Sequence, residues 1–89
     1  MNGPYEHESE ALTGPVHKDS RVVFERAYNR LELPRLVRDV HVEHLASACT
    51  AAGVELGTFD RRVLDWLAGQ ESSTVQVIVG IIHRAHEAR

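Results

Sequence analysis

The sequence predicts an all-α fold, a compact four-helix domain with one short helix behind a disordered N-terminal tail. Three observations support this fold class. The 89-residue chain is long enough for one domain only. Apolar residues recur at helical spacing in four successive segments. Prolines and glycines separate those segments. We place the tail at residues 1–17 and the helical domain at residues 18–89.

The tail, residues 1–17, mixes glycine and proline with acidic and small polar residues and has no apolar period. Such a segment offers little surface to bury, so we expect it to be disordered. The first helix should follow at once, with Asp19 or Ser20 as its N-cap, and continue to about Glu32. Its expected buried face consists of Phe24, Ala27, Tyr28 and Leu31.

The second helix should run from Pro34 to about Ala52. Proline suits the first turn of a helix, where its missing N–H has no partner to lose, and Gly53 suits the position after the last turn. At about 100° per residue, one side of this helix is apolar. That side carries Leu36, Val37, Val40, Ala48 and Ala51.

The third helix is short, has Thr58 or Asp60 as its expected N-cap, continues through Ala68 and ends at Gly69. Its expected buried side consists of Phe59, Val63, Leu64, Trp66 and Leu67.

The fourth helix should begin at Ser72 or Ser73 and run to about Ala88. Ser73 and Gln76 have the spacing of a capping box. The apolar residues span roughly 200° of its circumference, twice what a surface helix needs. The β-branched residues in this run would also suit a strand.

Composition indicates a cytoplasmic protein. The single cysteine, Cys49, suits a reducing compartment, and the acidic N-terminus does not resemble a secretory signal. The longest apolar run is far shorter than the roughly 20 residues of a membrane span. Net charge is −3, but three acids lie in the tail, so the rest of the chain is neutral. A neutral domain is a weaker candidate for nucleic-acid binding than a basic one.

The stretch DRRVLDWLAGQESSTVQVIVGIIHRA, residues 60–85, resembles a block found in small uncharacterised proteins of actinobacteria and their mobile elements. The resemblance implies a bacterial origin and a helical fold. The same region is similar in spacing to a helix-turn-helix, with Leu67, Ala68 and Gly69 followed by Thr74 and Val75. That similarity implies an alternative function, a DNA-binding regulator. Its DNA contacts would come from Arg61, Arg62, Gln76 and Arg84.

Four of the six histidines form two pairs with i, i+3 spacing, one pair on each of two predicted helices. Neutral imidazole is a common zinc ligand, so His41, His44 and His86 are the candidate metal ligands. We expect His44 in the middle of its helix's apolar arc and His41 near the edge. The interpretation that we favour is that His44 is a core or interface residue with one hydrogen bond satisfied and that the other histidines lie at the edges of the apolar faces. The metal site is one alternative, and the other is a switch in which protonation of a buried histidine disrupts packing. We expect no cofactor.

Sequence motifs of known catalytic sites are absent, and we expect no enzymatic activity. The expected function is a small protein-interaction or regulatory module that forms a homodimer through its fourth helix. The fourth helix carries more apolar surface than three other helices can cover, so a second copy or another protein should cover the remainder. The expected interface consists of Trp66, Val75, Val77, Ile78 and Ile81. The alternative is that the fourth helix is a central core helix, enclosed by the other three.

Overall fold

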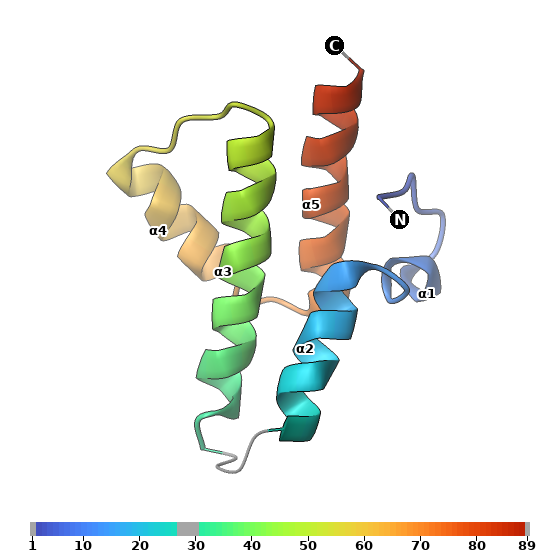
Figure 1. The fold of residues 1–89 in the computed structure, drawn as a ribbon, viewed down its shortest axis with the longest axis vertical. Helices are drawn as coiled ribbons and strands as arrows, with labels where there is room; N and C mark the ends of the chain where they lie inside the picture. Colours follow the sequence, from blue (N-terminus) through green and yellow to red (C-terminus); the bar gives the residue numbers. More distant parts are fainter. Residues whose placement is uncertain (1, 27–30, 89) are drawn as a thin grey trace.

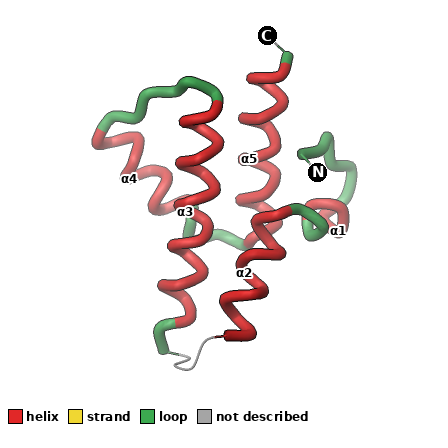
Figure 2. The backbone as a smooth tube through the Cα atoms, in the orientation of Figure 1, coloured by secondary structure: helices red, strands yellow, loops and turns green. Residues whose placement is uncertain are grey.

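Five α-helices make up the fold in a computed structural model that describes residues 2–26 and 31–88 (Figure 1). They are α1 (Glu8–Ala11), α2 (Pro15–Arg26), α3 (Leu33–Ala51), α4 (Thr58–Leu67) and α5 (Ser72–Glu87). No strand occurs among the described residues (Figure 2). The prediction of an all-α fold is therefore confirmed, and the β-branched run of the last segment is helical. Within the same residues, no helix is long and apolar enough to cross a membrane.

The core lies where α2, α3 and α5 pack against one another. Helix α4 packs mainly against α3, and α1 packs against α5, so these two short helices lie on opposite sides of the molecule (Figure 1). Six buried apolar residues form the core cluster, which consists of Val16, Leu45, Ala48, Ala68, Val75 and Val79.

Helix α3 begins and ends close to where the sequence predicts. Pro34 lies in its first turn, and Gly53 follows its C-terminal end with a φ of +74°, a conformation that glycine adopts without a steric penalty. The N–H of Val54 donates to the carbonyl of Cys49 at 2.8 Å, which satisfies a carbonyl left free by the last turn.

Helix α2 begins earlier than predicted, at Pro15. The Val16 N–H, one of the donors left free at the start of a helix, donates to Oε1 of Gln76 at 3.0 Å. A side chain from α5 therefore serves as the cap, and the predicted caps, Asp19 and Ser20, lie inside the helix.

The predicted buried face of the first helix is wrong where it can be seen. Phe24 is 56% exposed and Leu31 is 91% exposed. Ala27 and Tyr28 lie outside the described residues. Helix α2 ends at Arg26, and it turns Val16 and Ser20 inward instead.

The predicted disorder of residues 1–17 also differs from the structure, in which residues 2–14 form a segment, here called the N-terminal strap, that packs along α5. Ala11, within this segment, is fully buried. The approach is close, because a Cβ added to Gly80 would lie 2.5 Å from the Asn2 carbonyl oxygen. The strap packs on α5 through small residues and hydrogen bonds. A periodic pattern of apolar residues cannot predict contacts of this kind.

Helix α5 starts at Ser72, with Glu71 as its N-cap and no side-chain cap hydrogen bond. The predicted capping box of Ser73 and Gln76 does not form. Gln76 is fully buried, and its amide is used by α2 and the strap: Oε1 accepts from Val16, and Nε2 donates to the Tyr5 hydroxyl at 3.0 Å.

Candidate functional site

Helix α4 is exposed on the side that carries its aromatic residues. None of its residues is buried. Phe59 is 75% exposed, Val63 46% and Trp66 66%, and their spacing places them on one side of the helix. Leu64 and Leu67 alone pack against the core cluster. More than half of the predicted buried side of this helix therefore faces solvent.

Helix α5 contributes a second exposed apolar strip. At about 100° per residue, Val77, Ile81 and Ile78 follow one another around the helix, from the strap side to the core side. Ile81 is 49% exposed, and the other two are half-buried.

Both strips adjoin the core cluster. Ile78 and Ile82 of α5 pack against the cluster that also receives Leu64 and Leu67 of α4. The opposite edge of α4, with Arg61 and Asp65, lines a hollow against α3 instead. We call the exposed residues of both helices the α4–α5 apolar surface. It consists of Phe59, Val63, Trp66, Val77, Ile78 and Ile81.

The structure leaves four of the five predicted interface residues at least partly exposed and encloses the fifth. Trp66 and Ile81 are exposed, and Val77 and Ile78 are half-buried at the same surface. Val75 is fully enclosed in the core cluster, so it cannot contact a partner in this conformation. About 120° separates it from Ile81 around α5, which directs it toward α3.

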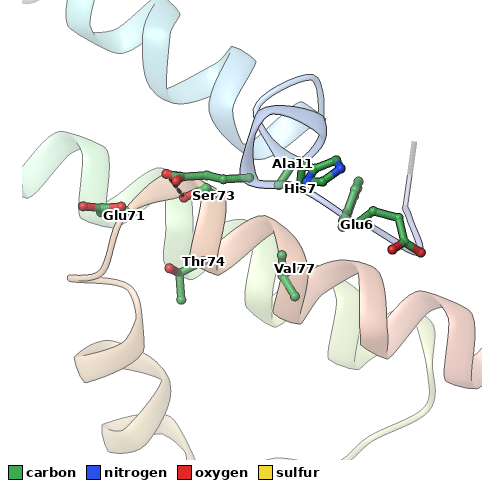
Figure 3. A pocket seen from close by; sticks show the side chains of 9 residues that line it. Glu6, His7, Ala11, Glu71, Ser73, Thr74 and Val77 are labelled. Carbon is green, nitrogen blue, oxygen red and sulfur yellow. Dashed lines mark hydrogen bonds between the residues drawn. The ribbon is translucent and has the colours of Figure 1, made fainter.

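An acidic hollow of about 350 Å³ lies between the strap and α5 (Figure 3). The carboxylate-bearing residues that line it are Glu6, Glu8 and Glu71, and Val77 extends the apolar surface to its edge. The Ser73 hydroxyl donates to Oε1 of Glu8 at 3.4 Å and ties the strap to α5. The apolar surface therefore has an acidic margin on this side.

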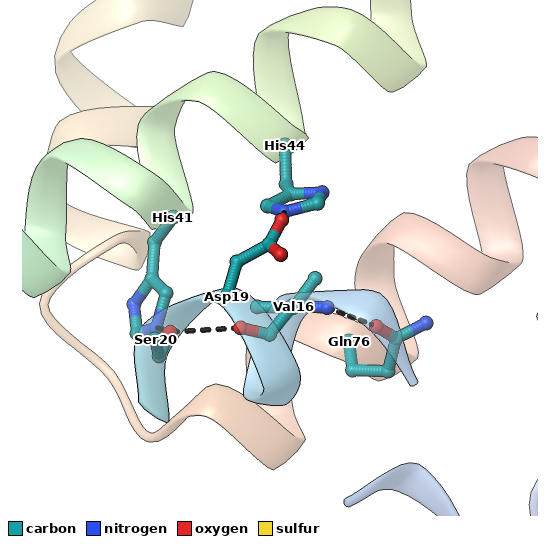
Figure 4. Close-up of polar contacts among 6 residues, drawn as sticks. All are labelled: Val16, Asp19, Ser20, His41, His44 and Gln76. Carbon is teal, nitrogen blue, oxygen red and sulfur yellow. Dashed lines mark hydrogen bonds and ion pairs between the residues drawn. The ribbon is translucent and has the colours of Figure 1, made fainter. Parts of the chain in front are cut away.

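Two histidines of α3 make polar contacts with α2 (Figure 4). His41 is 2% exposed. Its Nδ1–H donates to the Ala68 carbonyl at 2.8 Å, and its Nε2 lies 3.0 Å from Oγ of Ser20. Nε2 of His44 lies 2.6 Å from Oδ2 of Asp19. The predicted order is reversed, because His41 is the enclosed histidine and His44 lies nearer the edge.

Burial lowers the pKa of His41, although its hydrogen bond to the Ala68 carbonyl acts in the opposite direction and His44 adds to the lowering. The Ser20 hydroxyl also lies 2.8 Å from the Val16 carbonyl. A hydroxyl carries one hydrogen, so Ser20 donates either to that carbonyl or to a neutral His41. The contact joins α2, α3 and the α4–α5 turn. Hollows of about 620 and 410 Å³ flank it.

The candidate metal ligands do not gather. His41 uses both ring nitrogens within the core, His44 faces Asp19, and His86 is exposed near the end of α5. Over residues 2–26 and 31–88, no group of three or more histidine, cysteine or carboxylate side chains is placed to hold a metal ion.

The candidate DNA contacts are also dispersed. Arg61 and Arg62 are exposed on α4. Arg84 lies on α5 and donates from Nε to the Gly80 carbonyl of its own helix at 3.3 Å. Gln76 is enclosed, with both amide atoms bonded, so it cannot reach a base edge without leaving the core. The sequence gives one sign of this buried role, because Gln76 is the one polar side chain in an otherwise apolar run, residues 75–82.

No protein-family model, curated protein or solved structure matches this chain. The resemblance of residues 60–85 to a bacterial sequence block therefore stays a prediction.

Proposed function

We propose that the chain is a small, non-enzymatic protein-interaction module with a regulatory role, and that it works as a homodimer through the α4–α5 apolar surface. The observation that carries the proposal is the exposure of Phe59, Val63 and Trp66 on a helix with no buried residue. Large exposed apolar patches on small domains usually mark association sites. Aromatic residues, tryptophan above all, dominate the energetics of such sites.

The size of the surface suits a second copy. Phe59, Val63, Trp66 and Ile81 together expose on the order of 450 Å² per chain, since an aromatic side chain alone offers roughly 150–250 Å². A two-fold dimer uses the same patch on both chains, so these residues would bury on the order of 900 Å². The half-buried flanking residues bring the total toward the roughly 1,200 Å² of a small specific interface.

The non-enzymatic assignment is supported by the Ser20–His41 contact. A hydroxyl beside an imidazole is the pattern of an activated nucleophile. Here, however, Ser20 is only 8% exposed, and its Oγ lies within hydrogen-bond distance of the Val16 carbonyl of its own helix. A substrate carbonyl could not reach that oxygen unless α2 moved. We therefore assign this pair a structural role.

The test is sedimentation equilibrium of the full chain across the micromolar range, for the wild type and two variants. Trp66→Asp places a charge in the middle of the surface and should give a monomer. Phe24→Asp is the matched control, because Phe24 is also a half-exposed aromatic residue but lies on α2. This control should remain dimeric. A wild-type chain that stays monomeric over the whole range overturns the proposal.

A further inference from the structure

A hollow of about 620 Å³ lies between α2, α3 and the α4–α5 turn. Its volume falls within the roughly 300–1,000 Å³ of small-molecule sites. A second hollow of about 410 Å³ adjoins it, and the two share Phe24, Val37, His41 and Gln70 as lining residues. None of the six residues of the α4–α5 apolar surface lines either hollow. The space is therefore separate from the surface proposed for the homodimer.

One wall of the larger hollow is apolar. Phe24 of α2 and Leu33, Pro34 and Val37 of α3 line it. Phe24 is 56% exposed, so much of its ring is not covered by its own chain. The buried His41 also lines the hollow, but both of its ring nitrogens are bonded within the chain, so it offers no free hydrogen-bonding group. This wall suits an aromatic or aliphatic group.

The charged side chains that line the larger hollow are both arginines, Arg35 and Arg38, and no carboxylate lines it among the described residues. Arg35 lies 3.9 Å from Oε1 of Glu32 and is partly balanced by it. Arg38 takes part in none of the ion pairs formed within residues 2–26 and 31–88. Arg38 is therefore the cation of this hollow that an anionic ligand can pair with.

Other acidic residues nearby do not face the larger hollow. Asp39 follows Arg38 in the chain, but at about 100° per residue it lies about 160° from His41 around α3, on the side away from the hollow. Glu71 lines the smaller hollow but not the larger one. The larger hollow is therefore the one suited to an anion.

The guanidinium of Arg38 lies against the α4–α5 turn. A Cβ added to Gly69 would lie 3.1 Å from Nη2 of Arg38, so a glycine at this position leaves room for the guanidinium. A guanidinium offers its N–H donors in a planar fork that matches a carboxylate with two parallel hydrogen bonds. The hollow thus combines one anion-binding group with an apolar wall, which is the usual composition of a small-molecule site.

We propose that the larger hollow binds a small monocarboxylate with an aromatic or aliphatic body. Arg38 holds the carboxylate, and Phe24, Leu33 and Val37 contact the body. One unbalanced cation favours one carboxylate, and the apolar wall requires a ligand larger than acetate. The inference goes beyond the proposed homodimer and does not depend on it, because all of the lining residues belong to one chain.

Titration of the full chain with phenylacetate, followed by amide chemical shifts, tests the site. We expect the N–H signals of Gly69 and Gln70 to shift, with a dissociation constant on the order of 1 mM or below for a ligand of this size. Phenylacetamide has the ring without the charge, and acetate has the charge without the ring. Each should bind at least about tenfold more weakly than phenylacetate, because each lacks one of the two contacts.

Two variants separate the two contacts. Arg38→Gln removes the charge, so this variant should bind phenylacetate no better than phenylacetamide. Phe24→Ala removes the ring of the apolar wall, so it should weaken phenylacetate binding but keep the preference over phenylacetamide. The matched control is Arg61→Gln, because Arg61 is also an exposed arginine and lines a separate hollow of about 250 Å³ against α3. This control should keep the wild-type affinity, and circular dichroism checks that the helices of each variant are intact.

Three results would each overturn the proposal. The first is the absence of shifts at about 10 mM phenylacetate. The second is equal affinity for phenylacetate and phenylacetamide, which would indicate an apolar groove without anion recognition. The third is an unchanged dissociation constant in Arg38→Gln. None of these results depends on whether the wild type is a monomer or a dimer, so failure of the site and failure of the homodimer are distinguishable.

Discussion

Helices α3 and α4 are neighbours that use their apolar residues in opposite ways. Helix α3 turns Leu45 and Ala48 fully into the core, and even its enclosed polar group, His41, has both ring nitrogens bonded. Helix α4 buries no residue, and it presents an aromatic side chain at each end of its exposed side. One helix is stabilised by its own chain, and the other displays apolar surface that its own chain does not cover.

This difference shows that an amphipathic pattern predicts a helix with an apolar side but does not predict whether the same chain covers that side. The patterns of α3 and α4 both satisfy helical periodicity. Only α3, however, lies between two other helices, α2 and α5, whereas α4 has one main neighbour. A change in the core around α3 should therefore cost more stability than a change on the exposed side of α4.

Truncation of the core should have the largest effect. Leu45→Ala removes a fully buried side chain from the centre of α3 and leaves a cavity. We expect the free energy of unfolding to fall by about 2–5 kcal/mol, measured by chemical denaturation. In a domain this small, that loss is a large part of the total stability. A cost below about 1 kcal/mol would show that the core is looser than the burial indicates.

The buried amide of Gln76 should have the next largest effect. Gln76→Ala leaves the Val16 N–H without an acceptor at the start of α2 and removes the contact to Tyr5. We expect a loss of about 1–3 kcal/mol, the cost of an unsatisfied buried donor. Hydrogen exchange should show faster exchange at Val16. Gln70→Ala is the control, because Gln70 is exposed. Equal effects of the two changes would contradict the buried role.

The sequence predicts the helices of this fold well because apolar periodicity, and the prolines and glycines that end helices, depend only on residues close together in the chain. Pro34 and Gly53 mark the ends of α3 within a residue or two. Helix α4 begins at Thr58 with Gly57 as its N-cap, so the predicted caps, Thr58 and Asp60, lie inside the helix by one and three residues. The strap was missed for a different reason. It is held by hydrogen bonds and close backbone approach, such as the contact of Asn2 with Gly80, which join residues far apart in the chain.

The candidate site could be predicted only in part. Trp66 and Ile81 follow from the excess of apolar residues on two helices, and both are exposed in the structure. Val75 is also aliphatic but lies in the core. The angular positions of the residues around α5 show how wide its apolar arc is, but they do not show which part of that arc the other helices cover. The roles of His41 and His44 were exchanged for the same reason.

Acid should destabilise the folded chain through protonation of the buried His41. Burial places its folded-state pKa below the ordinary 6.5, so in the pH window just below 6.5 the unfolded chain binds more protons than the folded chain. Stability should therefore fall as pH falls through that window. The polar and titratable groups around His41 include Ser20 and His17 of α2, His44 and Arg38 of α3, and Glu71 of the α4–α5 turn.

The comparison that isolates this effect is the denaturation midpoint against pH for the wild type and for His41→Asn, which keeps hydrogen-bonding groups but does not titrate. The wild type should lose more stability than the variant between neutral and mildly acidic pH. Identical slopes would contradict the role of His41 in the loss of stability.

Truncation on α4 should have the smallest effect on the isolated chain. Trp66→Ala removes the largest side chain of the protein, yet that side chain is 66% exposed and contributes to no buried cluster. At concentrations where the chain is monomeric, we expect the free energy of unfolding to change by no more than about 0.5 kcal/mol. At higher concentrations the wild type should become more stable than the variant, because association stabilises the folded state by mass action. Denaturation at two protein concentrations measures both effects. A large loss in the dilute sample would mean that α4 belongs to the core of its own chain, and the contrast with α3 would then disappear.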